Sequence, residues 1–214
     1  ILRIAPLARA GSASASNAIL VARSRSSSGH FLKSHDSDPS VSSLPPTNPG
    51  RFSEPGNHAL GRSRDGWSTK IHAAVDAGRG VLACVLSAGQ AAHCPMMVPV
   101  LEAIRVAHRG RGRPRRRPRR VLAEKAYSSQ ANRAWLRAHH ISATIPVKAD
   151  QTAHRRARGS RGGRPPASDA VTYKNRNTVE RGFSHLKHHR ALATGYDKLA
   201  VRYQTTIRIA SITH

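Results

Sequence analysis

The sequence of 214 residues contains few acidic residues, few aromatic residues and only two cysteines. Asp and Glu together number 11, against 36 Lys and Arg, so the formal net charge at pH 7 is +25. A chain with this excess of positive charge attracts polyanions, nucleic acid first and acidic membrane surfaces second. Hydrophobic residues make up 38% and aromatic residues 4%, and we therefore expect part of the chain to contribute little to a core.

The scarcity of cysteine and of long apolar runs argues against metal-binding, disulfide-linked and membrane-spanning proteins. Cys84 and Cys94 lack the paired spacing of a zinc site, and His93 does not supply the missing ligands. We therefore expect two reduced thiols, as in a bacterial cytoplasm. No run of about 18 apolar residues occurs, so the sequence predicts no membrane-spanning helix.

Residues 1–56 consist mainly of Ala, Ser, Arg, Pro and Gly and have no sustained period of 2 or 3.6 residues. This composition is typical of a disordered or weakly ordered segment. Its beginning is Arg-rich, as in a targeting peptide, but no clear cleavage signal follows. The chain begins with Ile1 and ends at His214 within an apolar-rich run, and we expect both ends to be truncated.

The stretch from Trp67 to Gly89 is expected to form a β-hairpin. Two apolar runs, STKIHAAVD and VLACVLSAG, flank a Gly-containing turn in which Asp76 is a turn residue. A helix is expected after Pro95, because apolar residues follow at helical spacing. These residues are Met97, Val100, Leu101 and Ile104.

The apolar run from Arg120 to Ala123 predicts a short buried strand that ends at Glu124. α/β folds place their chemistry at such strand ends. Ser128 or Ser129 is expected to cap the next helix. The expected inner face of that helix consists of Ala131, Ala134, Trp135 and Ala138. A short strand at ATIPV follows, and the expected terminal helix buries Leu199, Tyr203, Ile207 and Ala210.

Two basic segments, Arg109 to Arg120 and His154 to Arg164, are too rich in charge and glycine to predict regular elements, and we expect exposed loops. A solvated loop that touches phosphates non-specifically explains either segment. The first segment also resembles arms that lay Arg along the minor groove of DNA, although the flanking proline of such an arm is missing on one side.

The stretch from Thr172 to His189 is predicted to form one helix with two distinct faces. Steps of three, four and seven residues return to nearly the same side of a helix. The polar side consists of Tyr173, Arg176, Glu180 and Lys187, and the neighbouring apolar stripe of Val179, Phe183 and Leu186. The helix is therefore expected to dock on a core while Glu180 points outward.

The spacing of that polar side, Tyr, two residues, Arg, three residues, Glu, six residues and Lys, resembles the signature of bacterial insertion-sequence transposases of the DDE type. Other segments between Leu60 and His214 resemble this family in the same order: LGRSRDGWSTKIHAAVD, RRVLAEKAYSS, ATIPVKADQ, RGSRGGRPP and LATGYDKLAVRYQ. The resemblance implies a ribonuclease-H-like α/β domain over residues 60–214, with a mixed sheet flanked by helices. Residues 1–59 do not resemble the family. They are either a diverged segment or the translation of a shifted reading frame, and we favour the second hypothesis.

The resemblance implies three acids that hold two divalent metal ions, usually Mg²⁺. Glu180 matches the third acid, and Glu124 stands where the family has Asp as the second. Both glutamates are therefore the expected catalytic residues and metal ligands. One extra methylene moves a carboxylate by about 1 Å, so we expect an impaired metal site. The first acid and its strand are not recognisable, because Asp36 and Asp38 stand at a suitable distance but in unsuitable surroundings.

The resemblance also implies double-stranded DNA as the partner, namely the terminal inverted repeats of the element and the target DNA. The residues expected to contact DNA are Tyr173, Arg176, Lys187, Arg161, Arg164 and Arg116. The expected function is metal-dependent strand cleavage and strand transfer by a homo-oligomer in the bacterial cytoplasm, at the nucleoid and without a membrane partner, impaired or lost in this copy. The alternatives are a basic nucleic-acid-binding protein without catalysis and an unstable gene remnant.

Overall fold

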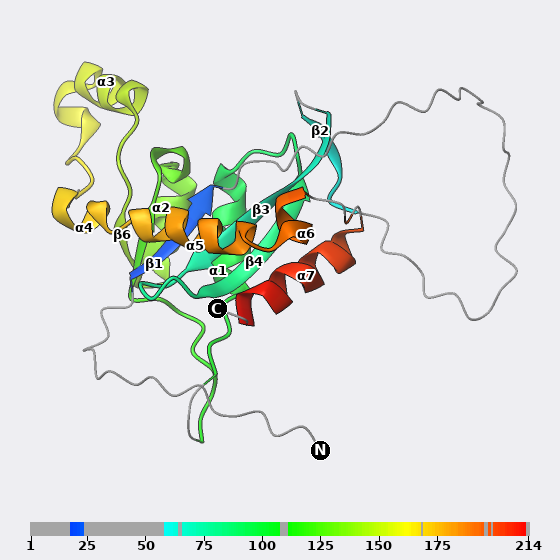
Figure 1. The fold of residues 1–214 in the computed structure, drawn as a ribbon. Helices are drawn as coiled ribbons and strands as arrows, with labels where there is room; N and C mark the ends of the chain where they lie inside the picture. Colours follow the sequence, from blue (N-terminus) through cyan, green and yellow to red (C-terminus); the bar gives the residue numbers. More distant parts are fainter. Residues whose placement is uncertain are drawn as a thin grey trace, which may run out of the picture.

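The computed structural model describes residues 18–23, 58–63, 66–107, 111–167, 169–194, 197 and 199–212. Figure 1 shows a central sheet with helices on both of its faces. This mixed α/β architecture confirms the expected ribonuclease-H-like fold class. Cys84 and Cys94 are free thiols, as expected. No helix within the ranges given above is long and apolar enough to cross a membrane.

The predicted hairpin is confirmed as the antiparallel pair β3 (Gly66–Val75) and β4 (Val81–Ala88). Asp76 is the turn residue: its N–H donates to the Gly80 carbonyl at 2.9 Å, and its Oδ1 accepts from the Gly80 N–H at 2.7 Å. The short strand β2 (Gly61–Ser63) pairs with the beginning of β3. The hairpin therefore forms one side of the sheet.

The centre of the sheet is β1 (Ala18–Arg23), which pairs antiparallel with β3 and parallel with β5 (Arg120–Ala123). We expected no strand at these residues, and here the structure differs from the expectation. The run AILVAR is short and lies among Ser and Arg residues, so its pattern does not identify a strand until β3 and β5 supply backbone partners.

The other side of the sheet agrees with the sequence analysis. β5 has the predicted bounds. β6 (Ser142–Thr144) lies beside it in parallel, begins one residue before the predicted ATIPV strand and overlaps its first two residues. β5 is buried on both faces of the sheet: Val121 and Ala123 point to one helical layer and Leu122 to the other. Packing on both faces therefore fixes the position of Glu124, the residue that follows the strand.

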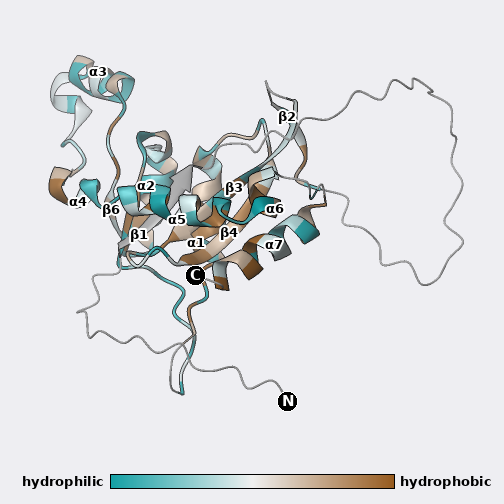
Figure 2. Ribbon diagram, viewed as in Figure 1, coloured by the Kyte–Doolittle hydropathy of each residue, from teal (hydrophilic) through white to brown (hydrophobic). Residues whose placement is uncertain are grey.

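One face of the sheet is covered by α1 (Met97–Glu102), which follows a 3₁₀ turn at Cys94–Met96, and by α2 (Gln130–Ala138). The four predicted core residues after Pro95 are all buried in this layer. Figure 2 shows hydrophobic residues on α1 and on the strands beside it. Between β5 and α2 lies a short 3₁₀ turn, Lys125–Tyr127.

The predicted inner face of α2 is wrong. Its three alanines are exposed, Trp135 is half-buried, and the buried residues are Asn132 and Leu136. Asn132 is buried because its amide donates to the carbonyls of Cys94 and Tyr127. The cap was predicted correctly, since the Ser129 hydroxyl accepts from the Asn132 N–H.

The opposite face of the sheet is covered by α5 (Asn177–Lys187), α6 (Arg190–Thr194) and α7 (Ala200–Ile212). Tyr203, Ile207 and Ala210 of α7 are buried as predicted, and Leu199 is half-buried just before the helix. Val179 and Leu186 of the predicted apolar stripe are buried, and Phe183 packs against both apolar clusters of this layer.

Two expected elements differ from the structure. The second basic segment is not wholly a loop, because α3 (Ala149–Ala157) and a 3₁₀ turn (Gly159–Gly162) occupy most of it. Helix α3 buries no residue and is mostly hydrophilic (Figure 2), so no apolar stripe marks it in the sequence. The predicted single helix is divided into α4 (Ala170–Lys174) and α5, joined by tight hydrogen bonds between residues three apart, such as Val179 N–H to the Arg176 carbonyl.

Candidate active site

Two glutamates from separate elements meet at one arginine. The Arg176 Nη1 atom donates to Glu124 Oε1 at 3.0 Å, and its Nη2 atom donates to Glu180 Oε1 at 3.0 Å. The side chains of Arg176 and Glu124 are 24% and 27% exposed, whereas that of Glu180 is 60% exposed. We call Glu124, Arg176 and Glu180 the acidic edge. It is open to solvent on the Glu180 side and partly shielded on the Glu124 side.

The backbone explains why Glu124 points toward this edge. Val121, Leu122 and Ala123 are fully buried, so the end of β5 is fixed by packing on both faces. Glu124 keeps an extended backbone (φ −68°, ψ 161°) and stands immediately before the 3₁₀ turn Lys125–Tyr127. The Tyr127 N–H donates to the Glu124 carbonyl at 2.9 Å, which holds the turn against the strand end.

Helix α5 brings Glu180 to the same edge by lying close to the sheet. Val179 and Gly182 are buried on either side of Glu180, and α5 contacts both β1 and β3. A Cβ atom at Gly182 would lie only 3.0 Å from Cγ1 of Val75. Glycine at this position therefore lets the helix approach β3 more closely than a larger residue would allow.

The tight turn between α4 and α5 places Arg176 between the two acids. Arg176 is the residue before α5 and has helical dihedrals (φ −56°, ψ −27°). Its guanidinium carbon lies 5.8 Å from the centre of the Tyr173 ring, within reach of a cation–π contact. The predicted polar face of Tyr173, Arg176 and Glu180 thus holds together although the helix is divided. The contact with Glu124 is one that the spacing did not predict.

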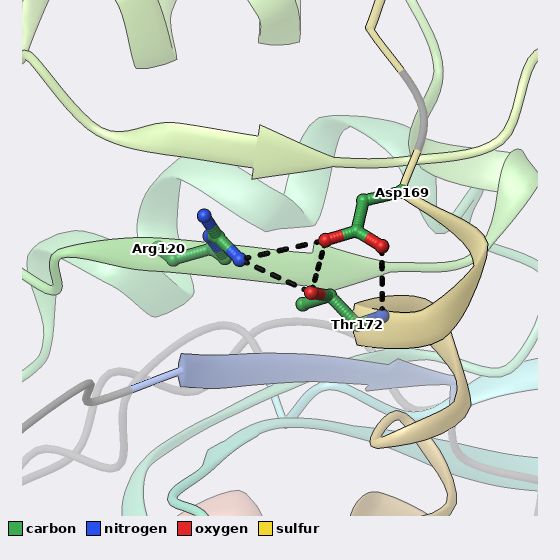
Figure 3. Close-up of polar contacts among 3 residues, drawn as sticks. All are labelled: Arg120, Asp169 and Thr172. Atoms are coloured by element: carbon green, nitrogen blue, oxygen red, sulfur yellow. Dashed lines mark hydrogen bonds and ion pairs between the residues drawn. The ribbon is translucent and has the colours of Figure 1, made fainter.

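A further polar contact that the sequence analysis missed ties α4 to β5 (Figure 3). Asp169 accepts from the Thr172 N–H at 3.0 Å and also from the Thr172 hydroxyl, so it caps α4. Arg120 at the beginning of β5 donates to the Thr172 hydroxyl at 3.3 Å and lies 4.0 Å from the Asp169 carboxylate. These hydrogen bonds from Thr172 lower the pKa of Asp169. Its place before Thr172 is the sequence signal of a helix cap.

The other predicted DNA-contacting residues lie elsewhere. Lys187 is exposed at the end of α5, about 10 Å along the helix from Glu180. Arg161 and Arg164 are exposed on the excursion through α3, which stands apart from the sheet at the upper left of Figure 1. Arg116 is exposed in the segment before β5, at the opposite end of that strand from Glu124. The structure therefore brings Tyr173 and Arg176 to the acids but not these four residues.

The central strand supplies no third acid. Val21 of β1 pairs with Ala123, so Ala22 is the next residue along β1 where Glu124 follows on the other strand. The strand AILVAR contains no acidic residue. Asp36 and Asp38 lie outside the described residues.

The residues of the acidic edge do not fit a two-metal site. Such a site needs carboxylates that hold two ions about 4 Å apart. Here two carboxylates share one guanidinium, and no group of three His, Cys, Asp or Glu residues that could hold a metal ion occurs in the described part of the chain. In this arrangement Arg176 balances one of the two negative charges of the pair.

A buried histidine forms a second polar site, in the layer of α1. His72 is fully buried, and its Nε2 atom lies 2.7 Å from the Ser87 hydroxyl. The His93 ring stands edge-on to it with the ring centres 5.5 Å apart. Burial, together with the neighbouring His93 and Lys70, lowers the pKa of His72 to about 4. His72 is therefore neutral at pH 7 and belongs to the core.

One family model matches most of the chain. The family model described as the transposase DDE domain matches residues 38–212. The match covers the described strands β2–β6 and all of the helices, and it starts before the domain boundary that we expected at residue 60. The comparison with curated proteins gave no match.

Proposed function

We propose that this chain, which belongs to the transposase DDE domain family, is the transposase of a bacterial insertion sequence with an impaired cleavage site. Its substrate would be double-stranded DNA, first at the terminal inverted repeats of the element and then at a target. The ancestral reaction is hydrolysis of a phosphodiester bond by water, followed by attack of the freed 3′ hydroxyl on target DNA. A homo-oligomer at the nucleoid would hold the paired ends.

The observation that carries this proposal is the meeting of Glu124 and Glu180 at one edge of the sheet. The two residues lie far apart in the sequence and reach the same guanidinium from a strand end and a helix. Carboxylates at the end of a buried strand and on a helix that covers the sheet are the elements of a metal-dependent nuclease site. This arrangement supports Glu124 and Glu180 as the catalytic pair.

Three features support impairment. Members of the family generally use a divalent metal, and Mg²⁺ is the ion that we propose for an intact member. Among the described residues, only Glu124 and Glu180 would hold it at the acidic edge. The first feature is Glu124, which is one methylene longer than the family's Asp. The second is Ala22, which is the next residue along the central strand β1 and supplies no carboxylate. The third is Arg176, which already binds both carboxylates.

DNA binding is supported by the net charge of +25 and by the basic residues around and beyond the acidic edge. We propose that Lys187 and Arg176 contact DNA phosphates and that Tyr173 positions the strand. Arg161, Arg164 and Arg116 would extend the contact along the duplex. The two glutamates accept from two of the five N–H groups of Arg176, so its other N–H groups could donate to a phosphate.

A second candidate function is a basic DNA-binding protein without catalysis. The observation in its favour is that Arg176 pairs with both acids, as in a purely structural network. The two functions differ in what Glu180 does. It is a reacting-site residue in the first and a partner of Arg176 in the second.

Nicking of supercoiled plasmid in Mg²⁺ by the full chain, beside DNA binding followed by fluorescence anisotropy, separates the two functions. For a transposase, Glu180→Ala abolishes the slow nicking and leaves DNA affinity within about twofold. Restoring Asp in Glu124→Asp is expected to raise the nicking rate by up to about a hundredfold. If the wild type and Glu124→Asp nick no faster than Glu180→Ala, the binding protein is the correct function.

A further inference from the structure

The segment that precedes β5 is a held arm and not a loose loop. We call residues 111–119 the basic arm. Val106, which follows α1, and Arg115 of the arm exchange two backbone hydrogen bonds, of 2.9 and 2.8 Å, which tie the arm to the segment before it. Pro118 is buried, and Arg117 donates to the His139 carbonyl at 3.3 Å, so the end of the arm is attached to the body. Figure 1 shows the arm running away from the sheet at the bottom of the view.

Two exposed arginines of the basic arm, Arg113 and Arg116, have no acidic partner within the described part of the protein. The arm contains six arginines and no acid. Arg113 and Arg116 are exposed, and none of the ion pairs among the described residues includes them. Six like charges on nine residues repel each other, and a polyanion is the partner that relieves this repulsion. Arg176 differs, because both of its carboxylate partners are already in place.

The basic arm also has a concave shape that suits a chain of phosphates. Arg113, Pro114, Arg116 and Arg117 line an open hollow of about 860 Å³. That space exceeds what a single phosphate group fills and admits part of a nucleic-acid backbone. Guanidinium groups bind phosphate oxygens through two parallel hydrogen bonds and remain charged at any physiological pH.

The position of the basic arm separates it from the acidic edge. Five residue steps along β5 lead from Arg119 to Glu124, and strand geometry makes this about 17 Å. One DNA strand advances about 3.4 Å per nucleotide, so this separation corresponds to about five base pairs. The phosphates held in the hollow therefore cannot be those next to the phosphodiester bond that would be cleaved at Glu124.

We propose that the basic arm is a second DNA-binding surface, which holds the phosphate backbone of duplex DNA at least about five base pairs away from the acidic edge. The identification of the polyanion as DNA rests on the proposed function, whereas the existence of the surface does not. Recognition is through phosphates alone, so the arm binds without sequence preference.

The test compares the double variant Arg113→Gln/Arg116→Gln with a matched control, Arg202→Gln/Arg208→Gln, which removes the same charge from the exposed side of α7. Affinity for a random 30-base-pair duplex is measured by anisotropy in EDTA over a salt series. Each lost phosphate contact lowers the slope of log K against log salt by about 0.9, so the arm variant should lose about 2 and the control less than 0.5. Circular dichroism confirms that both variants fold.

Trypsin protection of the wild-type chain gives an independent readout. Cleavage after Arg115 and Arg116, followed by mass spectrometry, should be fast without DNA and at least tenfold slower with it. Equal slopes for both variants, or no protection, would overturn the proposal. Tighter binding to duplex RNA than to DNA would overturn the choice of DNA. Because EDTA removes metal ions, a failure of nicking does not affect any of these results.

Discussion

The two ends of strand β5 carry opposite charges that are handled in opposite ways. At the end of the strand, the acids Glu124 and Glu180 share Arg176 as an ion-pair partner within the protein. Before its beginning, the basic arm presents six arginines, and its exposed Arg113 and Arg116 form no ion pair with the described residues. Four buried or half-buried residues separate these two regions.

The difference shows that charge alone does not identify a binding surface. Arg176 belongs to the polar face that resembles the family signature, yet in the structure it donates to two carboxylates of the protein itself. The arginines of the arm are less specific as a sequence signal but are more available to a polyanion. Whether an arginine is available to a polyanion depends on the ion pairs that it already forms, and the fold decides which ion pairs form.

The largest expected effect comes from breaking the strand that separates the two regions. Leu122→Ala removes a fully buried side chain from β5 and should lower the free energy of unfolding by about 2 to 5 kcal/mol. Urea denaturation followed by circular dichroism measures it. Ile212→Ala on the 76% exposed end of α7 is the control and should change stability by less than about 0.5 kcal/mol. Equal losses would mean that β5 is not the base of both regions.

Acidification should lower the free energy of unfolding through His72, which lies outside the acidic edge. The pKa of His72 is about 4 in the folded chain, below its unfolded value of 6.5. Between these values the unfolded chain binds the proton and the folded chain does not, so stability is complete above pH 6.5 and falls toward pH 4. The loss should reach about 3 kcal/mol.

Urea titrations at pH 7.0 and pH 4.5 measure this loss, with His72→Gln as the comparison. The glutamine amide can keep a hydrogen bond to Ser87 but does not titrate. The variant should therefore lose less stability on acidification than the wild type. The same pH dependence in both proteins would exclude His72 as the responsible group.

The smallest expected effect concerns the pairing at the acidic edge. Arg176→Gln leaves Glu124 and Glu180 without their shared cation, so the affinity for Mn²⁺ should rise about fivefold, as expected for an ion pair worth about 1 kcal/mol. Isothermal titration calorimetry measures the affinity directly. Arg181→Gln removes an exposed charge from the same helix and should leave it unchanged. An unchanged affinity in Arg176→Gln would show that the guanidinium does not compete with metal ions.

Local patterns predicted the parts of the fold that depend on near neighbours. The β3–β4 hairpin, β5 with Glu124 at its end, the Ser129 cap and the buried residues of α7 all follow from short-range periodicity and turn chemistry. The inner face of α2 was wrong because alanine fits either side of a helix. The buried residue there, Asn132, is polar and depends on carbonyl partners from other segments.

The sequence by itself determined the basic character of the chain, the order of most elements from Trp67 onward and the common face of Tyr173, Arg176 and Glu180. Only the tertiary structure decided that β1 is the central strand and that Arg176 joins Glu180 to Glu124. Periodicity acts over three or four residues of chain, whereas a strand pairing or an ion pair between distant residues forms only when the whole sheet has assembled.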